Sequence, residues 1–463
     1  MSQASQSGRK HAIVMGGSMA GLLAARVLTD YFGQVTLIER NQFPAEAEQR
    51  RGVPQGRHTH ALLASGKQVL DELFPGLAED LLHRGALTGD IGEARWFFEG
   101  GCLSRVTSGL KGLLLTRPFL ESGVRDRVLA NPKIARRDNL QVEGLVLEKS
   151  SGRVTGVRAG EETLSADLVV DATGRGSRSP VWLEEMGYEK PREDAVQVAL
   201  AYTTRFFRRL PTDLGGDMAA IIPPTPEGKR GGVMIAQEGD RWTCTLIGHF
   251  GNHAPEELAG YVEYAKTLPG PYIHQVVSRN EPLGDAVSAR FPASTRRRYE
   301  LLKRFPAGYL VFGDAICSFN PIYGQGMSVS ALQSIELRKA LARGVGDADF
   351  AKTFFSQAAK VVDIPWAIAV GNDLRMPETV GPRNAGVKFI NWYLSKLHKA
   401  AHNDPVLAVA FHKVGNLLAP PPSLFHPRIT SRVLLGNLRP SRPAANAQPA
   451  SESAAPSAAA ETE

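Results

Sequence analysis

The sequence predicts an α/β fold in which one parallel-sheet domain is built from separated segments, a β-sheet domain is inserted, and a helical region follows. An apolar strand, a glycine turn and an alanine-rich helix occur together in VMGGSMAGLLAARVL, which begins at Val14. Long β-rich runs fill residues 190–290. The segment GYLVFGDA, which begins at Gly308, then repeats the buried-strand pattern of the first domain. A chain that returns to its first sheet this late must carry an inserted domain.

Composition is that of an ordinary globular enzyme, with 463 residues, 43% hydrophobic and 22% charged. The net charge of +7 permits an anionic partner, but we expect no nucleic-acid partner. Three scattered cysteines indicate neither disulfides nor zinc and fit a cytoplasmic location. No uncharged apolar run reaches the roughly 18 residues of a transmembrane helix. His58 and His60 lack a third ligand, so we expect no metal site.

Five regions follow from the pattern along the chain. The polar and small residues 1–9 and the Ala-, Pro-, Ser- and Glu-rich residues 440–463 are expected to be disordered tails. Residues 10–180 and 300–345 are expected to form the first domain. Residues 181–299 form the β-rich domain, and residues 346–439 form the C-terminal helical region.

Within the first domain, alternating elements predict a strand–helix layering. Short apolar runs predict strands at 12–15, 35–38 and 167–170, and a hairpin joins strands at 140–147 and 153–158. Helices are expected at 66–73, 118–129 and 328–342. A further helix at 387–397 carries an apolar stripe. This stripe either packs on the protein's own core, or forms a lid or a surface for membrane lipid or an oily substrate.

The first glycine turn has the features of a dinucleotide-binding βαβ unit. Gly16 suits the tight turn after the strand, and Gly21 lets the helix pack closely on it. Ser18 replaces the middle glycine of Gly-x-Gly-x-x-Gly, but its hydroxyl can donate to phosphate or cap the helix. The helix N-terminus attracts a pyrophosphate. Glu39, 18 residues after Gly21, stands where an acid binds a ribose.

A later segment, GYLVFGDAICSFNPIYGQGMS, favours a flavin over a nicotinamide as the resident dinucleotide. Asp314 follows a buried strand and a glycine, so it is placed to accept hydrogen bonds from a ribityl chain. Pro321 sets a rigid turn, and Gly324 and Gly326 let the backbone lie against a flat ring. The helix after Gly326 points its positive end at that ring, where it would stabilise the negative charge of a reduced flavin.

Together these segments resemble the class A flavoprotein monooxygenases, which have the para-hydroxybenzoate hydroxylase fold. RGVPQGRHTHALL (51–63), LLLTRPFLE (113–121) and FNPIYGQGMS (319–328) are more similar to bacterial FAD-dependent epoxidases of polyether biosynthesis and to squalene epoxidases. Ser18 and the region after residue 350 depart from the pattern. The resemblance implies FAD contacts at Gly16, Ser18, Met19, Ala20, Glu39, Arg40, Arg57, Arg117, Asp314, Pro321, Gly324, Gly326 and Met327.

The expected activity is an FAD-dependent monooxygenation, an epoxidation or hydroxylation of an apolar, electron-rich molecule of polyketide or prenyl type in secondary metabolism. Reduced FAD would react with O2 to a C4a-hydroperoxide, so the protein itself needs no catalytic acid or base, and we name no catalytic residue. NADPH or NADH would bind transiently, or a separate flavin reductase would supply electrons. The clusters Arg205–Arg209 and Arg296–Arg298 are either solvated faces or a site for the phosphorylated nicotinamide.

Alternatives remain on the same fold. One is a flavin-dependent reductase or dehydrogenase of a prenyl chain, and another is a non-catalytic lipid- or protein-binding module similar to the Rab GDP-dissociation inhibitors. The intact loop with Pro321, Gly324 and Gly326 disfavours the binding module. The Trp-x-Trp-x-Ile-Pro signature of flavin halogenases is absent.

Overall fold

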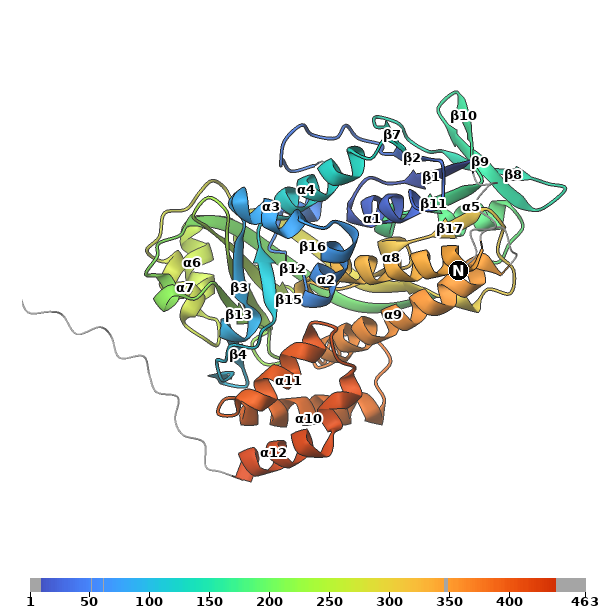
Figure 1. Cartoon of the computed structure of the whole chain (residues 1–463). Coiled ribbons are helices and arrows are strands. Elements are labelled where there is room, and N and C mark those ends of the chain that lie inside the picture. Colours follow the sequence, from blue (N-terminus) through green and yellow to red (C-terminus); the bar gives the residue numbers. More distant parts are fainter. Residues whose placement is uncertain (1–9, 51, 61, 345–348, 439–463) are drawn as a thin grey trace, which may run out of the picture.

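The structure, a computed structural model, describes residues 10–50, 52–60, 62–344 and 349–438. Its first domain is organised around a five-stranded parallel sheet in the order β17-β11-β1-β2-β7. The strands are β1 (His11–Met15), β2 (Gln34–Ile38), β7 (Ile134–Arg137), β11 (Leu168–Asp171) and β17 (Tyr309–Val311). β17 pairs with β11 although the paired residues Val170 and Leu310 lie 140 positions apart in the sequence. The predicted fold class, with a discontinuous first domain, is confirmed (Figure 1).

Helices and a second sheet complete this domain. The antiparallel sheet β8 (Gly144–Glu148), β9 (Arg153–Ala159) and β10 (Glu162–Ser165) contains the predicted hairpin. One hydrophobic core joins Val14, Leu22 and Val170 to residues of the later helices, such as Leu337. The helices are α1 (Met19–Leu28), α2 (Ala64–Leu73), α3 (Leu77–His83), α4 (Arg117–Leu129), α5 (Ser179–Glu185), α8 (Gly326–Arg343) and α9 (Phe350–Asp373).

The β-rich domain is an eight-stranded sheet in the order β18-β16-β12-β15-β14-β13-β4-β5. Helices α6 (Leu258–Lys266) and α7 (Tyr272–Val277) pack on one face, over Trp242 and Phe207. The two-stranded sheet β3 (Leu87–Asp90) and β6 (Lys111–Leu114) lies beside it. The strands are β4 (Arg95–Phe98), β5 (Gly101–Cys102), β12 (Glu193–Arg208), β13 (Ala219–Ile222), β14 (Arg230–Gln237), β15 (Arg241–His249), β16 (Val287–Arg297) and β18 (Cys317–Ser318).

Three of these strands, β4, β5 and β18, come from stretches that the sequence analysis assigned to the first domain. β4 and β5 lie within residues 10–180, yet β4 pairs with β13 through Arg95 with Ala220 and Trp96 with Ile221. A four-residue strand has too short a pattern to specify its partner, which only the tertiary fold selects. This excursion brings Trp96 and Phe98 to the C-terminal helices, whose core they join.

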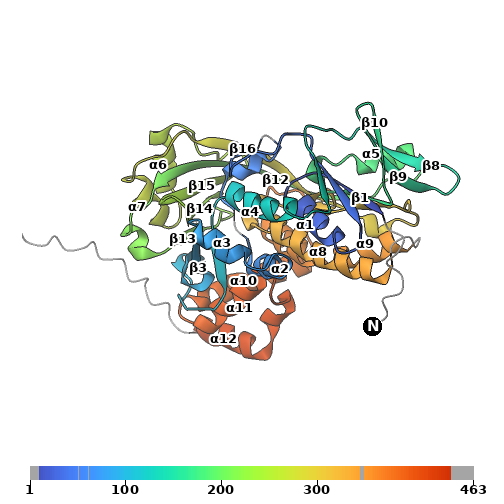
Figure 2. The same ribbon diagram turned by 45° about the horizontal axis from the view of Figure 1, so that its top comes forward.

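The C-terminal helices α10 (Ala385–Ala401), α11 (Pro405–Gly415) and α12 (Pro427–Leu438) form a small bundle beneath the β-rich domain (Figure 2). On α10, Tyr393 and Leu397 are buried as predicted for packing on the core, but Phe389 and Ile390 are 54% and 44% exposed. The apolar stripe is therefore divided between core and surface. The predicted tails, residues 1–9 and 440–463, lie outside the described residues.

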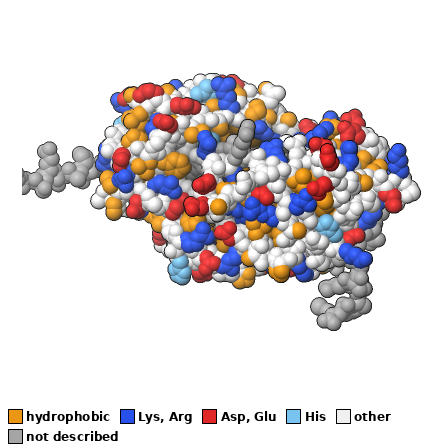
Figure 3. Space-filling view, turned by 90° about the horizontal axis from the view of Figure 1, so that it is seen from above, with side chains coloured by type: hydrophobic (Ala, Val, Ile, Leu, Met, Phe, Trp, Pro, Cys, Tyr) orange, Lys and Arg blue, Asp and Glu red, His pale blue; other side chains and the backbone are white. Residues whose placement is uncertain are grey.

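The surface carries no obvious segregation of charge on the face seen from above, where basic and acidic side chains are interspersed (Figure 3). Within the described ranges, no helix combines the length and the apolar character that crossing a bilayer requires.

Helix α1 crosses very close to the turn after β1. Gly16 has a φ of +100°, in the left-handed region, and its N–H donates to the Ile38 carbonyl at 2.8 Å. A Cβ added at Gly21 would lie only 1.7 Å from the Gly16 carbonyl oxygen. Gly21 therefore fixes how near the helix N-terminus can come to the sheet.

We expect Gly21→Ala to lower the stability of the protein by at least about 1–3 kcal/mol, because the helix must move away from the turn. The matched control is Gly371→Ala on α9, where an added Cβ meets nothing within 4 Å. Alanine favours a helix interior by up to about 1 kcal/mol, so this variant should melt at or above the wild-type temperature. Thermal unfolding followed by circular dichroism compares them. Equal melting temperatures for Gly21→Ala and wild type would contradict the close packing.

Candidate functional site

A single cavity of about 1400 Å³ extends from the carboxyl ends of the parallel strands, across the β-rich sheet, to the C-terminal helices. Ligands of α/β proteins bind at such strand ends. The volume exceeds the roughly 300–1000 Å³ of a pocket for one small ligand. Its lining contains twelve of the thirteen predicted FAD residues: Gly16, Ser18, Met19, Ala20, Glu39, Arg40, Arg117, Asp314, Pro321, Gly324, Gly326 and Met327.

Arg57, the thirteenth, is exposed and does not line this cavity. It belongs to the short 3-10 helix Pro54–Arg57, whose neighbour Gln55 does line it. A contact between Arg57 and a cofactor stays a prediction. Arg40 lies at the rim, because it is exposed although it lines the cavity.

At the dinucleotide end, Glu39 is held by the backbone of two turns. Its Oε2 accepts from Gly17 N at 2.9 Å, and its Oε1 accepts from Asn41 N at 3.1 Å. Arg50, which the sequence analysis did not identify, donates from Nη2 to Glu39 Oε2 at 3.1 Å and from Nη1 to the Gly17 carbonyl at 2.9 Å. Arg50 lines the cavity and lies directly before the segment RGVPQGRHTHALL, but no local pattern distinguishes it from the neighbouring Arg51.

A second acid, Glu121, completes a buried ionic cluster at this end. Arg50 Nη1 lies 3.3 Å from Glu121 Oε1, and Arg117 Nη2 lies 3.1 Å from Glu121 Oε2. Arg117 Nη2 also donates to Ser18 Oγ at 2.9 Å. The Ser18 hydroxyl forms no helix cap and instead contacts these charged groups. The Arg117 guanidinium and the N-terminal amides of α1 thus offer N–H donors to the same part of the cavity, as an anionic pyrophosphate requires.

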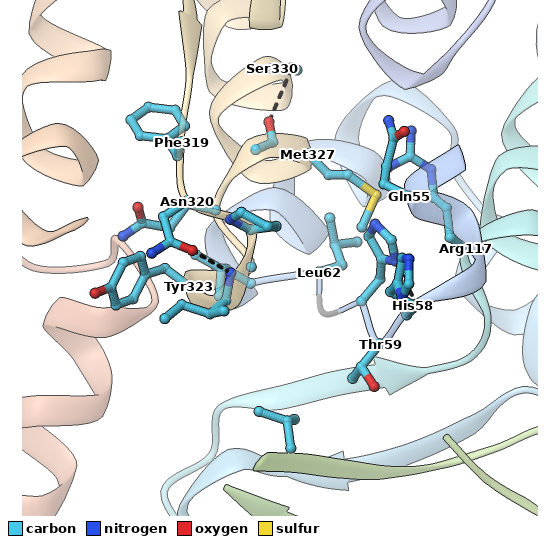
Figure 4. A pocket seen from close by; sticks show the side chains of 18 of the residues that line it. Gln55, His58, Thr59, Leu62, Arg117, Phe319, Asn320, Tyr323, Met327 and Ser330 are labelled. Atoms are coloured by element: carbon cyan, nitrogen blue, oxygen red, sulfur yellow. Dashed lines mark hydrogen bonds between the residues drawn. The ribbon is translucent and has the colours of Figure 1, made fainter. Parts of the chain in front are cut away.

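The loop after β17 forms the wall of the cavity opposite Arg117 (Figure 4). Hydrogen bonds to α9 hold this loop in place. Asn320 donates from Nδ2 to Asp373 Oδ1 at 2.8 Å, and Tyr323 OH donates to the same oxygen at 2.7 Å. Burial raises the pKa of Asp373 to about 7, while these two hydrogen bonds oppose the rise. Gly324 has a φ of +64°, which explains a glycine at this turn.

Asp314 is an acceptor without a donor in this wall. No hydrogen bond to its carboxylate comes from any residue in the described part of the chain. Burial raises its pKa, and the positive charges of Arg117 and Arg175 oppose that rise. A Cβ on Gly326, the first residue of α8, would lie 3.6 Å from Asp314 Oδ1. The carboxylate and the free amides of this helix end therefore face one space, which suits a ligand with both hydroxyl and carbonyl groups.

The β-rich sheet supplies the middle of the cavity. His58 Nδ1 lies 2.8 Å from Thr204 Oγ1, and Thr204 Oγ1 lies 2.6 Å from Thr245 Oγ1. His58 meets the Tyr202 ring edge-on at 4.4 Å. Burial lowers the pKa of His58 to about 4, with Arg57 adding to the shift, so the imidazole is neutral at pH 7. Apolar side chains surround this short polar row: Val233, Ile235, Ile247 and Phe291.

The far end of the cavity lies between β4 and the C-terminal helices. Here Phe98 stacks on His398 with centroids 4.3 Å apart, and Phe411 meets His398 edge-on at 4.6 Å. The ring centroids of Trp96 and His412 lie 5.2 Å apart. All five of these side chains line the cavity. Burial lowers the pKa of His398 to about 3 and that of His412 to about 4.

Other predicted features are placed elsewhere. Arg205 and Arg296 are buried, where Arg205 donates to the Gly284 carbonyl and Arg296 pairs with Asp363. The interpretation of both clusters as solvated faces was therefore wrong for these two residues, whose guanidinium groups bind neighbouring parts of the protein. Among the residues that the structure describes, no group of three or more His, Cys, Asp or Glu side chains is arranged to hold a metal ion.

Comparison with solved structures identifies the class of fold. The chain superposes on PqsL, described as a probable FAD-dependent monooxygenase from Pseudomonas aeruginosa, with a TM-score of 0.60, 17% identity, and coverage of 82% of this chain and all of PqsL. It superposes on the flavin-dependent brominase Bmp2 with a TM-score of 0.59, 16% identity, and coverage of 92% and 98%. The fold is therefore that of the FAD-dependent monooxygenases and halogenases.

No protein-family model matches the sequence. A curated relative, Protein Rv3254 of Mycobacterium tuberculosis, is 36% identical over 440 residues, which is 89% of this chain and 90% of the relative. The chain belongs to the same family as Protein Rv3254.

The buried histidines at the far end predict how stability depends on pH. In the unfolded chain His398 takes up a proton below about pH 6.5, but in the folded protein it stays neutral down to about 3. The contribution of the neutral His398 to the free energy of unfolding is therefore fully present above about pH 6.5 and is lost as the pH falls. We expect His398→Leu to reduce the loss of unfolding free energy between pH 6.5 and 5 by up to about 2 kcal/mol.

Urea unfolding at a series of pH values measures this effect. The exposed His253 supplies the matched control, since His253→Leu should follow the wild-type dependence. Parallel curves for His398→Leu and wild type would show that the imidazole is not held neutral.

Proposed function

We propose that this chain is an FAD-dependent monooxygenase that inserts one oxygen atom into an apolar, electron-rich small molecule. The observation that carries the proposal is the continuity of the cavity. A cradle with dinucleotide chemistry, at Ser18, Glu39 and Arg117, opens without a break into a chamber lined by apolar side chains. An enzyme that oxygenates an apolar molecule on a bound flavin needs these two environments in contact.

The residues present fit FAD at each end. Glu39 would bind the ribose, and Arg117 with the amides of α1 would bind the pyrophosphate. Asp314 would accept from the ribityl hydroxyls, which fits its lack of a donor in the described chain. The turn at Pro321–Gly324 and the N-terminus of α8 would hold the ring. Bound FAD, once reduced, would supply the activation of O2.

The chain's own contribution to the reaction is positioning and exclusion of water. The imidazoles of His58 and His60 are neutral at pH 7, because burial lowers the pKa of His58 to about 4 and that of His60 to about 3. They can orient a substrate by hydrogen bonds without acting as cations. The apolar side chains of β14 and β15 would exclude water from the reacting centre. Electron-rich double bonds of a polyketide or prenyl chain suit this environment, so we favour epoxidation over hydroxylation.

The electrons would come from NADPH or NADH bound transiently, or from a separate flavin reductase. Arg205 and Arg296 already bind other groups of the protein. This favours a source of electrons that does not require these two arginines to bind a phosphate. A PqsL structure in complex with 2-aminobenzoylacetate illustrates that a protein of this fold accepts a small organic molecule.

Oxygen incorporation tests the function directly. Purified protein, reconstituted with FAD, is given NADPH, NADH or a general flavin reductase, together with a panel of prenyl and polyketide alkenes. We expect noncovalent FAD, released by acid precipitation, and products one oxygen atom heavier whose oxygen derives from O2. Saturated products without oxygen uptake would instead indicate a reductase, and failure to bind FAD would overturn the proposal.

Asp314 is predicted to contribute to FAD affinity. Asp314→Ala removes charge-assisted hydrogen bonds worth about 1.5–3 kcal/mol each, so the Kd of FAD should rise about tenfold or more. The apoprotein should remain folded, since no described donor bonds this carboxylate. Flavin fluorescence titration gives the Kd, and Asp30→Ala, a surface change on the same domain, is the control. An unchanged Kd would remove Asp314 from the cofactor site.

Gly326→Val tests whether the flavin ring lies against the loop. The backbone at Gly326 is not in the left-handed region, and an added Cβ meets only Asp314 Oδ1 at 3.6 Å. The variant should therefore fold, while its side chain fills space that the ring needs. We expect loss of bound FAD with retained weak binding of ADP-ribose at the Ser18 end.

Circular dichroism checks folding of this variant, and flavin absorbance checks occupancy. Gly33→Val, at an exposed position of the same domain, should keep full flavin content. If Gly326→Val is folded, fully flavinated and as active as wild type, the ring does not lie against this loop.

A further inference from the structure

The far end of the cavity contains buried polar atoms that the proposed chemistry does not use. Both ring nitrogens of His398, and Nε2 of His412, are buried and have no hydrogen-bond partner in the described chain. Histidine at such a position ordinarily bonds at least one nitrogen, because an unpaired buried polar group costs free energy. Both residues line the cavity.

The ring of His398 is held in place by aromatic neighbours. Phe98 stacks on the face of this ring, and Phe411 meets it edge-on. The ring therefore cannot simply rotate to reach another hydrogen-bond partner. The nearby His402 already has a hydrogen-bond partner, because its Nε2 lies 2.8 Å from the Phe98 carbonyl oxygen. Arg375, whose charge helps to lower the pKa of His398, is paired with Glu99 at 2.8 Å. The imidazole of His398 is thus preorganised, neutral and unpaired.

This arrangement defines the chemistry of a partner. A neutral imidazole donates from one nitrogen and accepts at the other, so it matches a hydroxyl or a carbonyl oxygen. A carboxylate or phosphate would need a cation here, and Arg375, whose charge acts on His398, is already paired with Glu99. The surrounding side chains Trp96, Phe98, Leu394 and Phe411 are apolar or aromatic and suit a hydrocarbon chain. The same cavity continues to the loop at Pro321–Gly326.

We propose that His398, with His412 beside it, is a recognition point for a neutral oxygen at the distal end of an elongated, otherwise apolar substrate. The substrate class is therefore a long unsaturated chain that carries a hydroxyl or carbonyl group remote from the carbon that is oxygenated. This inference rests on the proposed function for the location of the reacting end, while the binding point itself depends only on the residues of the far end.

Binding of a matched pair of probes tests the proposal without turnover. Farnesol and farnesene have the same carbon skeleton, but farnesene lacks the terminal hydroxyl and has one further double bond in its place. Binding to the oxidised, FAD-loaded protein is measured by calorimetry and by the change in flavin absorbance. We expect wild type to bind farnesol about tenfold more tightly than farnesene, the ratio that one buried hydrogen bond supplies.

Two variants assign this preference to the imidazole. His398→Leu should bind both probes equally, with farnesene affinity close to wild type and thermal stability at pH 7 retained, because no described partner is lost. His398→Gln, which also donates and accepts, should restore part of the preference. His253→Leu, at an exposed position, should behave as wild type.

Equal binding of the two probes by wild type, absence of binding by both, or an undiminished preference in His398→Leu would each overturn the proposal. The outcome is independent of the oxygenation assay. A preference for farnesol that depends on His398, in a protein that incorporates no oxygen, would retain the recognition point and reject the monooxygenase function. Oxygen incorporation without any role of His398 would do the reverse.

Discussion

The buried cluster of Arg50, Arg117, Glu39 and Glu121 is the interaction on which the arrangement of this site depends. It joins the turn after β1, the end of β2, the loop before α2 and the first turn of α4, four segments that are separate in the sequence. Each of its four side chains is at most 7% exposed. Removing one partner from such a cluster leaves an uncompensated buried charge, at a cost of about 3–5 kcal/mol. Its two positive and two negative members balance, so the cradle is stable before any anion enters.

The rest of the molecule is arranged around this cradle by backbone constraints. The contact between Gly21 and Gly16 places the N-terminus of α1 against the turn. Pairing of β17 with β11 then delivers Asp314 and the loop that follows it to the same edge of the sheet. The hydrogen bonds of Asn320 and Tyr323 to Asp373 tie that loop to α9. The proposed cofactor site thus depends on contacts between residues that lie up to about 140 positions apart in the sequence.

The features that could be predicted from the sequence are those whose residues lie close together along the chain. Gly16, Gly21 and Glu39 occur within one βαβ unit, and the turn at Pro321–Gly326 occurs between one strand and one helix, so their spacing alone indicates their surroundings. Arg50 enters the site through partners distant in sequence, and no periodicity marks it. The pairing of β4 with β13 is likewise a tertiary choice. The role proposed for His398 could not be predicted from the sequence either. Only the packing of the three C-terminal helices against β4 shows that its ring nitrogens lack partners in the described chain.

The excursion of β4 toward the C-terminal bundle has a consequence for how such a protein can change over time. The groups suited to the cofactor come from residues before 345, whereas α10 and α11, with the two aromatic residues of β4, form the distal wall. These two sets of residues line one cavity but come from different elements of the chain. A substitution in the bundle can therefore change the distal wall of the cavity without replacing a residue of the cradle. The cavity is in this respect modular, since the proposed cofactor cradle and the proposed recognition point for the substrate lie on different elements.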